Sequence, residues 1–320
     1  MKLKSFYSFL TKDLEVIENE LLSSVQTKDP LIREAGIHLL QAGGKRIRPV
    51  FVLLSGMFGD YNIDRMKPVA VALELIHSAS LVHDDVIDNA ELRRGKPTVN
   101  AKWDNRIAMY VGDYLFARAL EIITELDDPL IHRVLSKALV ELCLGEIEQI
   151  NDKYNFDQSY RTYVKRIKRK TALLIAVSCQ LGALASGAPE SVCKKLYLYG
   201  YYVGISYQII DDLLDFTSTE EELGKPVGSD LLQGNITLPV LFAMQNEELR
   251  KKIVKINNQT TAEEIKPIIY EIKKSRAIEQ SMNISDRYLQ KSFHQLEGLK
   301  HGKARTSLYN IAKYIGKRKF

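Results

Sequence analysis

Cysteine is scarce in this chain of 320 residues, which has only three, at Cys143, Cys179 and Cys193. An odd number of widely separated cysteines, without a CxxC pair or paired histidines, argues against a disulfide scaffold and against a zinc site. Reduced thiols are typical of a cytoplasmic protein, and we expect that location here.

Segments for secretion or membrane insertion are also lacking. The N-terminal residues have no uninterrupted apolar core and no small-residue cleavage site, so they do not predict a signal peptide. Residues 171–189 carry no charge and have about the length of a bilayer span. Serine, glutamine and glycine dilute this run, and basic residues crowd only one flank. These features favour a buried helix, with a membrane span as the alternative.

The charge balance shows no strong excess of one sign, with 45 basic against 40 acidic residues and a net charge of +5. Such a balance does not predict a nucleic-acid partner, but it suits anionic ligands at local basic sites. The basic run at 161–170 is interpreted as a solvated helix face. A surface for a partner or an anionic membrane is the alternative, which would allow peripheral membrane contact.

Period-two alternation, low-complexity blocks, linkers and repeats are absent, whereas apolar residues follow helical spacing nearly throughout. The pattern therefore predicts one all-α domain over residues 1–320. The predicted helices cover 67–93, 101–126, 132–150, 158–186, 189–216, 237–245, 261–274, 277–296 and 306–317, and a further helix begins near Pro49. Two stretches, 173–184 and 196–210, are apolar on nearly every face, so we expect them at the centre of a bundle.

Two copies of one acidic pattern follow apolar helical stretches. The first, DDVID, begins at Asp84 and the second, DDLLD, begins at Asp211. The first and last aspartates of each copy are four residues apart and share a helix face, where like charges destabilise a bare helix. Mg²⁺ compensates such a pair, because it binds through one or two carboxylates plus substrate phosphate. A single copy would fit a solvated acidic face, but the recurrence favours a metal site. Its six carboxylates are Asp84, Asp85, Asp88, Asp211, Asp212 and Asp215.

Basic and polar residues accompany both acidic motifs. The segment GGKRIRP, residues 43–49, puts cations on a glycine-flexed turn at a helix start, where free backbone N–H groups also favour phosphate. Arg93 and Arg94 follow the first motif, and Lys225 follows the second. Each alone would fit a solvated charge, and their recurrence beside the acidic motifs indicates an anionic ligand. The polar residues singled out are His77, which also fits a satisfied core histidine, Gln208, Lys170 and Thr171.

These motifs occur in a familiar order. GGKRIRP is followed by ELIHSASLVHDDVID, LRRGKPT, KTALL, YQIIDDLLDF and LGKPVGSDLLQGNITLP. From residue 43 to 239 the chain resembles the trans-isoprenyl (polyprenyl) diphosphate synthases. Within that family it is most similar to the large catalytic component of bacterial heptaprenyl diphosphate synthases, which GEIEQI and the IAKYIGKRKF ending support.

The resemblance implies an all-helical isoprenoid-synthase bundle with its two aspartate motifs facing each other across a deep central cavity. It implies up to three Mg²⁺ ions on Asp84, Asp88 and Asp211, supported by Asp85, Asp212 and Asp215. Arg93 and Lys225 would hold an allylic diphosphate, whereas isopentenyl diphosphate would bind Lys45, Arg48, His77 and Arg94. Lys170, Thr171 and Gln208 would lie beside the allylic carbon. One departure is Asn235, which stands where short-chain members often carry a second lysine.

The implied reaction adds isopentenyl diphosphate head-to-tail to an allylic diphosphate, with farnesyl diphosphate favoured. Departure of diphosphate leaves an allylic cation, so charge stabilisation and exclusion of water suffice without a Ser, Cys or His nucleophile. Residues one to two turns before Asp84 would limit the product length, namely Ile76, Ala79 and Ser80 with Ala72 and Leu75 below. The small Ala79 and Ser80 suggest an open channel and a product of about thirty to forty carbons, with thirty-five favoured, for menaquinone side chains.

Several alternatives stay open on the sequence. The intact DDLLD argues against a terpene cyclase, and six histidines in all argue against a phosphohydrolase built on His83 and Asp84. A prenyl-diphosphate-binding subunit, inactive without a small helical partner, is the rival from another class. The product could also be hexaprenyl or octaprenyl diphosphate. The resemblance further allows either a heterodimer with that non-catalytic partner or a homodimer.

Overall fold

The computed structural model describes residues 3–219 and 226–317. Helices make up 75% of it. Among the described residues the β structure is one antiparallel hairpin, in which Leu92 pairs with Pro97 and Arg93 with Lys96. The predicted all-α class is therefore confirmed.

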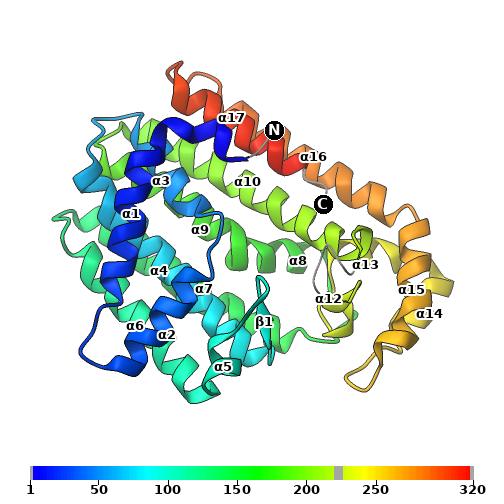
Figure 1. The fold of residues 1–320 in the computed structure, drawn as a ribbon. Helices are drawn as coiled ribbons and strands as arrows, with labels where there is room; N and C mark the ends of the chain where they lie inside the picture. Colours follow the sequence, from blue (N-terminus) through cyan, green and yellow to red (C-terminus); the bar gives the residue numbers. More distant parts are fainter. Residues whose placement is uncertain (1–2, 220–225, 318–320) are drawn as a thin grey trace. The chain divides into compact units, whose positions relative to one another are not determined.

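The element order follows the labels of Figure 1. The elements before the hairpin are η1 (Leu3–Leu10), α1 (Thr11–Ser24), α2 (Pro30–Gln41), α3 (Ile47–Gly56) and α4 (Ile63–Ile87). The hairpin is β1 (Leu92–Arg93) with β2 (Lys96–Pro97). Then come α5 (Val99–Lys102), α6 (Asn105–Ile123), α7 (Pro129–Asn151), α8 (Tyr160–Ile167), η2 (Lys168–Ala172), α9 (Leu173–Ala185) and α10 (Glu190–Thr217). The last are α12 (Ser229–Leu232), α13 (Leu238–Ala243), α14 (Glu247–Ile253), α15 (Ala262–Lys274), α16 (Ala277–Leu296) and α17 (Lys303–Gly316).

The chain divides into two compact units, and each is described by itself. The first unit comprises Met1–Leu135, Val177–Tyr197 and Leu299–Leu308. The second comprises Ser136–Ala176, Leu198–Gly298 and Tyr309–Phe320.

Helix α4 is the central element of the first unit. Its start is fixed by Asn62, whose side chain accepts a 2.8 Å hydrogen bond from the backbone N–H of Asp64. From Met66 to Ala79 nearly every residue is buried, and the helix packs against α1, α3 and α6. A helix that is apolar on all faces needs neighbours on all sides, and this packing brings the first acidic motif to the C-terminal end of a rigid core helix.

The second unit has two apolar clusters. One joins α8 and η2 to the C-terminal half of α10 and includes Tyr163, Ile167, Ile205 and Ile209. The other packs buried residues of α10, α12 and α13, among them Phe216, Leu231 and Val240, against α14 and α15, which lie together in Figure 1. The first of these clusters surrounds the second acidic motif, so that motif also belongs to a well-packed helix.

Three predicted helices end early or are interrupted in the structure. The helix predicted over 67–93 ends at Ile87, because Asn89 has φ +48° and the chain turns into the hairpin. The helix predicted over 101–126 is interrupted before Asp104, which caps α6 by accepting a 2.7 Å bond from the N–H of Ile107. The helix predicted over 158–186 contains the π-helical turn η2. Helices α1, α2, α12 and α14 were not among the predicted ones.

Residues 171–185 lie almost entirely within the core rather than at the surface, as predicted for this uncharged run. Across residues 3–219 and 226–317, no helix combines the length and apolar character that crossing a bilayer requires. All three cysteines are free, with Cys143 exposed and Cys179 and Cys193 buried.

The interpretation of the basic run 161–170 as a solvated face is wrong for two of its arginines. Arg166 is only 6% exposed and donates to the side chain of Gln158 and the carbonyl of Ile236. Arg169 forms ion pairs with Glu141 at 2.9 Å and Glu148 at 2.5 Å. These charges are used inside the second unit, because a guanidinium can satisfy several acceptors at once.

Candidate functional site

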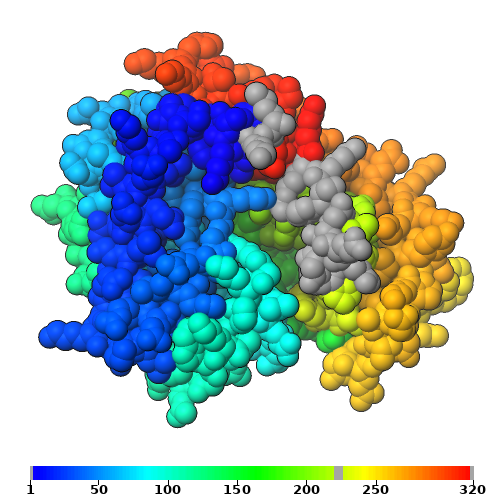
Figure 2. All heavy atoms as spheres, viewed as in Figure 1, coloured from blue at the N-terminus to red at the C-terminus, as the bar shows by residue number. Residues whose placement is uncertain are grey.

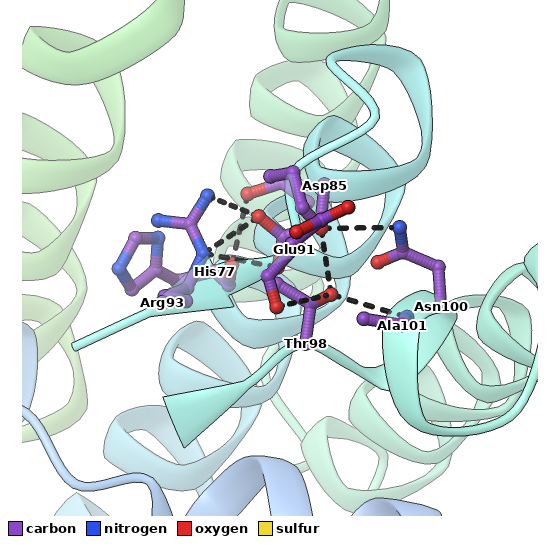
Figure 3. A network of polar contacts seen from close by, with 9 residues as sticks. His77, Asp85, Glu91, Arg93, Thr98, Asn100 and Ala101 are labelled. Carbon is purple, nitrogen blue, oxygen red and sulfur yellow. Dashed lines mark hydrogen bonds and ion pairs between the residues drawn. The ribbon is translucent and has the colours of Figure 1, made fainter. Parts of the chain in front are cut away.

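The three aspartates of the first acidic motif have different surroundings. Asp85 is only 2% exposed, and its carboxylate accepts hydrogen bonds from Nε of Arg93 at 2.8 Å and Nη2 at 2.6 Å (Figure 3). Asp84 is half-buried, and Asp88, at the end of α4, is exposed. Asp85 therefore ties the hairpin to α4, and Asp84 and Asp88 are the carboxylates open to solvent.

The hairpin that carries Arg93 is held by a dense set of hydrogen bonds (Figure 3). Thr98 Oγ1 donates to the carbonyl of Ala90 at 2.7 Å, and Asn100 Nδ2 donates to the same carbonyl at 3.2 Å. The N–H of Ala90 in turn donates to the backbone carbonyl of Asp85 at 2.9 Å. The loop is thus anchored to the last turn of α4, and it is visible at the surface as the cyan segment of Figure 2.

The turn of the hairpin places a large cation where glycine is normally favoured. Arg94 has φ +54° and Gly95 has φ +75°, the two positive values that a two-residue type I′ turn requires. A non-glycine residue is strained in this region. We interpret Arg94 as present for its side chain rather than for its backbone preference.

Arginines gather around one histidine in the first unit. The pKa of His77 is held well below 6.5, first by burial and then by the positive charges of Arg48, Arg94 and Arg93. The backbone of Gly44 lies close to the guanidinium of Arg94, since a Cβ on Gly44 would lie 2.6 Å from Nη1 of Arg94. The structure therefore brings together a neutral imidazole and several predicted anion-binding residues, an arrangement suited to a diphosphate.

Lys45 and Arg48 flank the start of α3, as the GGKRIRP segment predicted. Between them, Arg46 adopts φ +45° at the N-cap of the helix. Its side chain turns to Glu18 and Glu74 rather than to solvent. Sequence reasoning counted it among the possible phosphate-binding cations and did not anticipate this role.

The second acidic motif also separates into exposed and buried carboxylates. Asp211 is exposed, whereas Asp212 is 3% exposed. Asp212 accepts hydrogen bonds from the hydroxyl of Tyr163 at 2.7 Å and from Nε2 of Gln208 at 2.8 Å. Burial raises its pKa to about 7, with Asp230 as the next contribution, although both hydrogen bonds act in the opposite direction.

Asp215 faces protein as well. It is 2% exposed and accepts a 3.0 Å hydrogen bond from Oγ of Ser229 and a 3.2 Å bond from the N–H of Asp230. It therefore anchors the start of α12. The i, i+4 spacing alone did not predict that Asp211 and Asp215 would differ in this way.

The π-helical turn η2 directs two neighbouring residues to different helices. Lys170 Nζ donates to Oε1 of Gln149 on α7 at 2.9 Å. Thr171 Oγ1 donates to Oε1 of Gln208 on α10 at 2.5 Å. A π turn inserts one extra residue into a helix and is frequent at functional sites.

The hydroxyl of Thr171, the amide of Gln208, the carboxylate of Asp212 and the hydroxyl of Tyr163 thus form one continuous hydrogen-bonded chain. The structure brings the first three together as predicted site residues. Tyr163 and Gln149 were missed, because no spacing or charge pattern marks an isolated tyrosine or glutamine on a helix.

The residues predicted to set product length lie on α4. Ile76 and Ala79 are fully buried, and Ser80 is half-buried with its hydroxyl donating to the carbonyl of His77 at 2.9 Å. Their role in setting product length stays a prediction.

Lys225, predicted to bind the allylic diphosphate, lies outside the described residues. Asn235 donates its backbone N–H to the carbonyl of Asp230 at 2.8 Å.

The carboxylates of the two acidic motifs suit Mg²⁺ that is shared with a substrate phosphate, rather than a metal ion bound by protein ligands alone. Within the described parts of the chain, no group of three or more His, Cys, Asp or Glu residues could hold a metal ion. Asp84, Asp88 and Asp211 instead offer carboxylates that reach solvent, while Arg93 and the partners of Asp212 fix the intervening aspartates. Mg²⁺ is usually bound through one or two carboxylates together with substrate phosphates and water.

Several known proteins similar to the chain are prenyl diphosphate synthases or prenyl transferases by name. It is 68% identical over 320 residues to heptaprenyl diphosphate synthase component 2 of Bacillus subtilis, covering 100% of this chain and 92% of that protein. It is 62% identical to the protein of the same name from Geobacillus stearothermophilus, with both chains covered completely. The crystal structure of heptaprenyl diphosphate synthase from Staphylococcus aureus matches with a TM-score of 0.94 and 42% identity, covering 97% of this chain and 98% of that one.

Residues 29–272 match the family model described as Polyprenyl synthetase. Members of this family are generally Mg²⁺-dependent prenyltransferases. The similarity confirms the predicted fold and class of enzyme, a transferase of the trans-polyprenyl diphosphate synthase type. The chain therefore belongs to the polyprenyl synthetase family.

Proposed function

We propose that this chain is the catalytic component of a Mg²⁺-dependent heptaprenyl diphosphate synthase. It would add isopentenyl diphosphate head-to-tail to an allylic diphosphate, with farnesyl diphosphate as the favoured primer. The observation that carries the proposal is the full-length identity of 68% to a heptaprenyl diphosphate synthase component 2. The gathering of arginines around His77 supports an anionic substrate.

In the first unit, Asp84 and Asp88 would bind Mg²⁺, and Arg93 would both fix Asp85 and bind the allylic diphosphate. Lys45, Arg48, Arg94 and His77 would bind isopentenyl diphosphate. A neutral imidazole suits this place, because it can donate one hydrogen bond to phosphate without adding to the repulsion among the arginines.

In the second unit, Asp211 would bind Mg²⁺, with Asp212 and Asp215 supporting the helix that carries it and Lys225 adding a cation. Bound Mg²⁺ would stabilise the negative charge that develops on the departing diphosphate. Thr171 and Gln208 would present oxygen dipoles to the allylic cation. The hydrogen bond between them fixes the direction of both dipoles, and Lys170 is held beside them by Gln149.

Product length would depend on α4. The tail would extend past Ser80 and Ala79 toward Ile76 in a deep cavity, and the small side chains of Ala79 and Ser80 favour a product longer than twenty carbons. We propose thirty-five carbons, as the names of the relatives from Bacillus subtilis, Geobacillus stearothermophilus and Staphylococcus aureus indicate for those proteins. Such a chain would serve as a menaquinone side chain.

The name component 2 of two relatives supports a partner subunit. We propose that this chain, as one catalytic domain, assembles with a small non-catalytic component in the cytoplasm and contacts the membrane only peripherally. A homodimer would be the simpler assembly.

A prenyl-transfer assay tests the proposal. The purified chain would receive Mg²⁺, labelled isopentenyl diphosphate and farnesyl diphosphate, with and without the small component, and an EDTA control. We expect an EDTA-sensitive product of thirty-five carbons. A product of fifteen or twenty carbons would contradict the chain length. If Mg²⁺-dependent binding of farnesyl diphosphate and prenyl transfer were both missing with the partner present, the proposed function would be wrong.

A further inference from the structure

Arg46 is the middle cation of GGKRIRP, and its backbone and side chain are both unusual. It lies between Lys45 and Arg48 and has φ +45° at the N-cap of α3. Non-glycine residues persist in this left-handed region only when their surroundings hold them there. Local contacts must therefore stabilise the left-handed backbone conformation of Arg46.

The side chain supplies that cause, because its guanidinium connects three segments of the first unit. Nε and Nη2 donate to the two carboxylate oxygens of Glu18 on α1, at 2.9 Å and 3.0 Å. Nη1 donates to Oε1 of Glu74 on α4 at 3.1 Å. Nη2 also donates to the carbonyl of Leu40, in the last turn of α2, at 2.9 Å.

These four bonds leave little of Arg46 for a ligand. A guanidinium has five N–H donors, and the side chain is 15% exposed. Its partner Glu74 has a side chain that is 5% exposed, and Oε2 of that residue is buried without a hydrogen-bond partner. The ion pair of Arg46 and Glu74 is thus a fixed internal anchor. Lysine cannot replace the planar guanidinium, which binds both carboxylate oxygens of Glu18.

We propose that Arg46 is a positioning residue that fixes the GGKRIRP turn and thereby sets the places of Lys45 and Arg48 for the diphosphate of isopentenyl diphosphate. This inference rests on the proposed function for its substrate. It assigns to Arg46 no contact with that substrate. Loss of the anchor should therefore weaken use of isopentenyl diphosphate selectively, while the allylic diphosphate is affected less.

The test uses Arg46→Met, Arg46→Lys and a matched control. Lys67 pairs with Glu20 at 3.0 Å and bridges the same helices, α1 and α4, outside the turn. Lys67→Met therefore removes a comparable bridge without touching GGKRIRP. Because Arg46→Met leaves the buried Glu74 unpaired, a double variant, Arg46→Met with Glu74→Met, removes the buried charge as well and guards against misfolding.

Two readouts are needed on the full chain, with its small component present for kinetics. Hydrogen exchange of the amides at 45–48 and 50 should become faster in all the Arg46 variants and stay unchanged in Lys67→Met. The KM for isopentenyl diphosphate should rise about ten-fold or more, since small displacements of binding groups are costly. The KM for farnesyl diphosphate should change less than about three-fold.

Unchanged hydrogen exchange in the Arg46 variants would overturn the inference, whether or not the enzyme is active. Faster exchange with equal effects on both KM values would overturn the selective role of the turn. If the wild-type protein transferred no prenyl group, the proposed function would fail instead, and with it the substrate assigned to the turn, while the exchange data would still decide whether Arg46 positions it.

Discussion

The hydroxyl of Tyr163 donates a 2.7 Å hydrogen bond to Oδ2 of Asp212, the second aspartate of the second acidic motif. Tyr163 is fully buried, and the bond joins α8 to α10 across 49 positions of the sequence. The other oxygen of Asp212 is bonded to Gln208. Tyr163 therefore helps to orient the amide that faces Thr171.

Replacing Tyr163 by Phe removes one of the hydrogen bonds that the buried carboxyl group of Asp212 accepts. We expect the free energy of unfolding to fall by about 1–2 kcal/mol and kcat to fall about ten-fold because Gln208 loses its fixed orientation. Tyr154→Phe is the matched control, since it deletes a 2.9 Å hydrogen bond to the backbone carbonyl of Leu232 rather than to an aspartate of the motif. Urea unfolding and prenyl-transfer kinetics would measure both. Equal losses of kcat in the two variants would contradict the orienting role.

The exposed and buried aspartates of α10 should respond differently to Mg²⁺. For Asp211→Asn, the Mg²⁺ concentration at half-maximal activity should rise about ten-fold or more, because a ligand is lost. Asp215→Asn places an amide against the N–H of Asp230 and should lower the free energy of unfolding by about 1–3 kcal/mol. A Mg²⁺ titration of activity and a urea titration separate the two effects. The assignment of Asp211 as a ligand fails if its Asn variant keeps the wild-type Mg²⁺ dependence.

The sequence predicted the helical class and most helices of the structure correctly, because apolar spacing reports directly on burial. It also placed the acidic motifs at helix positions with no tertiary information. It did not predict which aspartates of each motif are buried, because the deciding partners, such as Arg93, Tyr163 and Ser229, come from other elements. The π turn at 168–172 was not predicted either, because one inserted residue shifts the phase of a helix without changing its composition in a recognisable way.

An aromatic ring at Ala79 should shorten the product. Ala79 is fully buried, so Ala79→Phe would fill space in which the growing chain is proposed to lie, at an overpacking cost of about 1–3 kcal/mol. Ala70→Phe is the control, because the buried Ala70 lies on the opposite side of the helix, about 180° away. Products would be sized after dephosphorylation. An unchanged product length for Ala79→Phe, with activity retained, would contradict the proposed path of the chain.

His77 should make the fold sensitive to mild acid. Its pKa in the folded state is well below 6.5, so below pH 6.5 the unfolded chain binds a proton that the folded chain does not. The free energy of unfolding should then fall as the pH falls, by at most about 1.4 kcal/mol per pH unit for this group. His77→Asn should reduce the slope of unfolding free energy against pH between pH 6.5 and 5, and the exposed His294→Asn is the control. Identical slopes in wild-type and His77→Asn protein would show that the histidine does not contribute.

The unequal burial of the cysteines gives the protein a single chemical handle. The thiolate is the reactive form, and burial raises the pKa of Cys179 to about 12 and also raises that of Cys193. Maleimide reagents should therefore attach at Cys143 on α7 in the native protein, and at all three thiols after unfolding. A fluorophore at that one position would report on α7 during assembly without any engineered substitution.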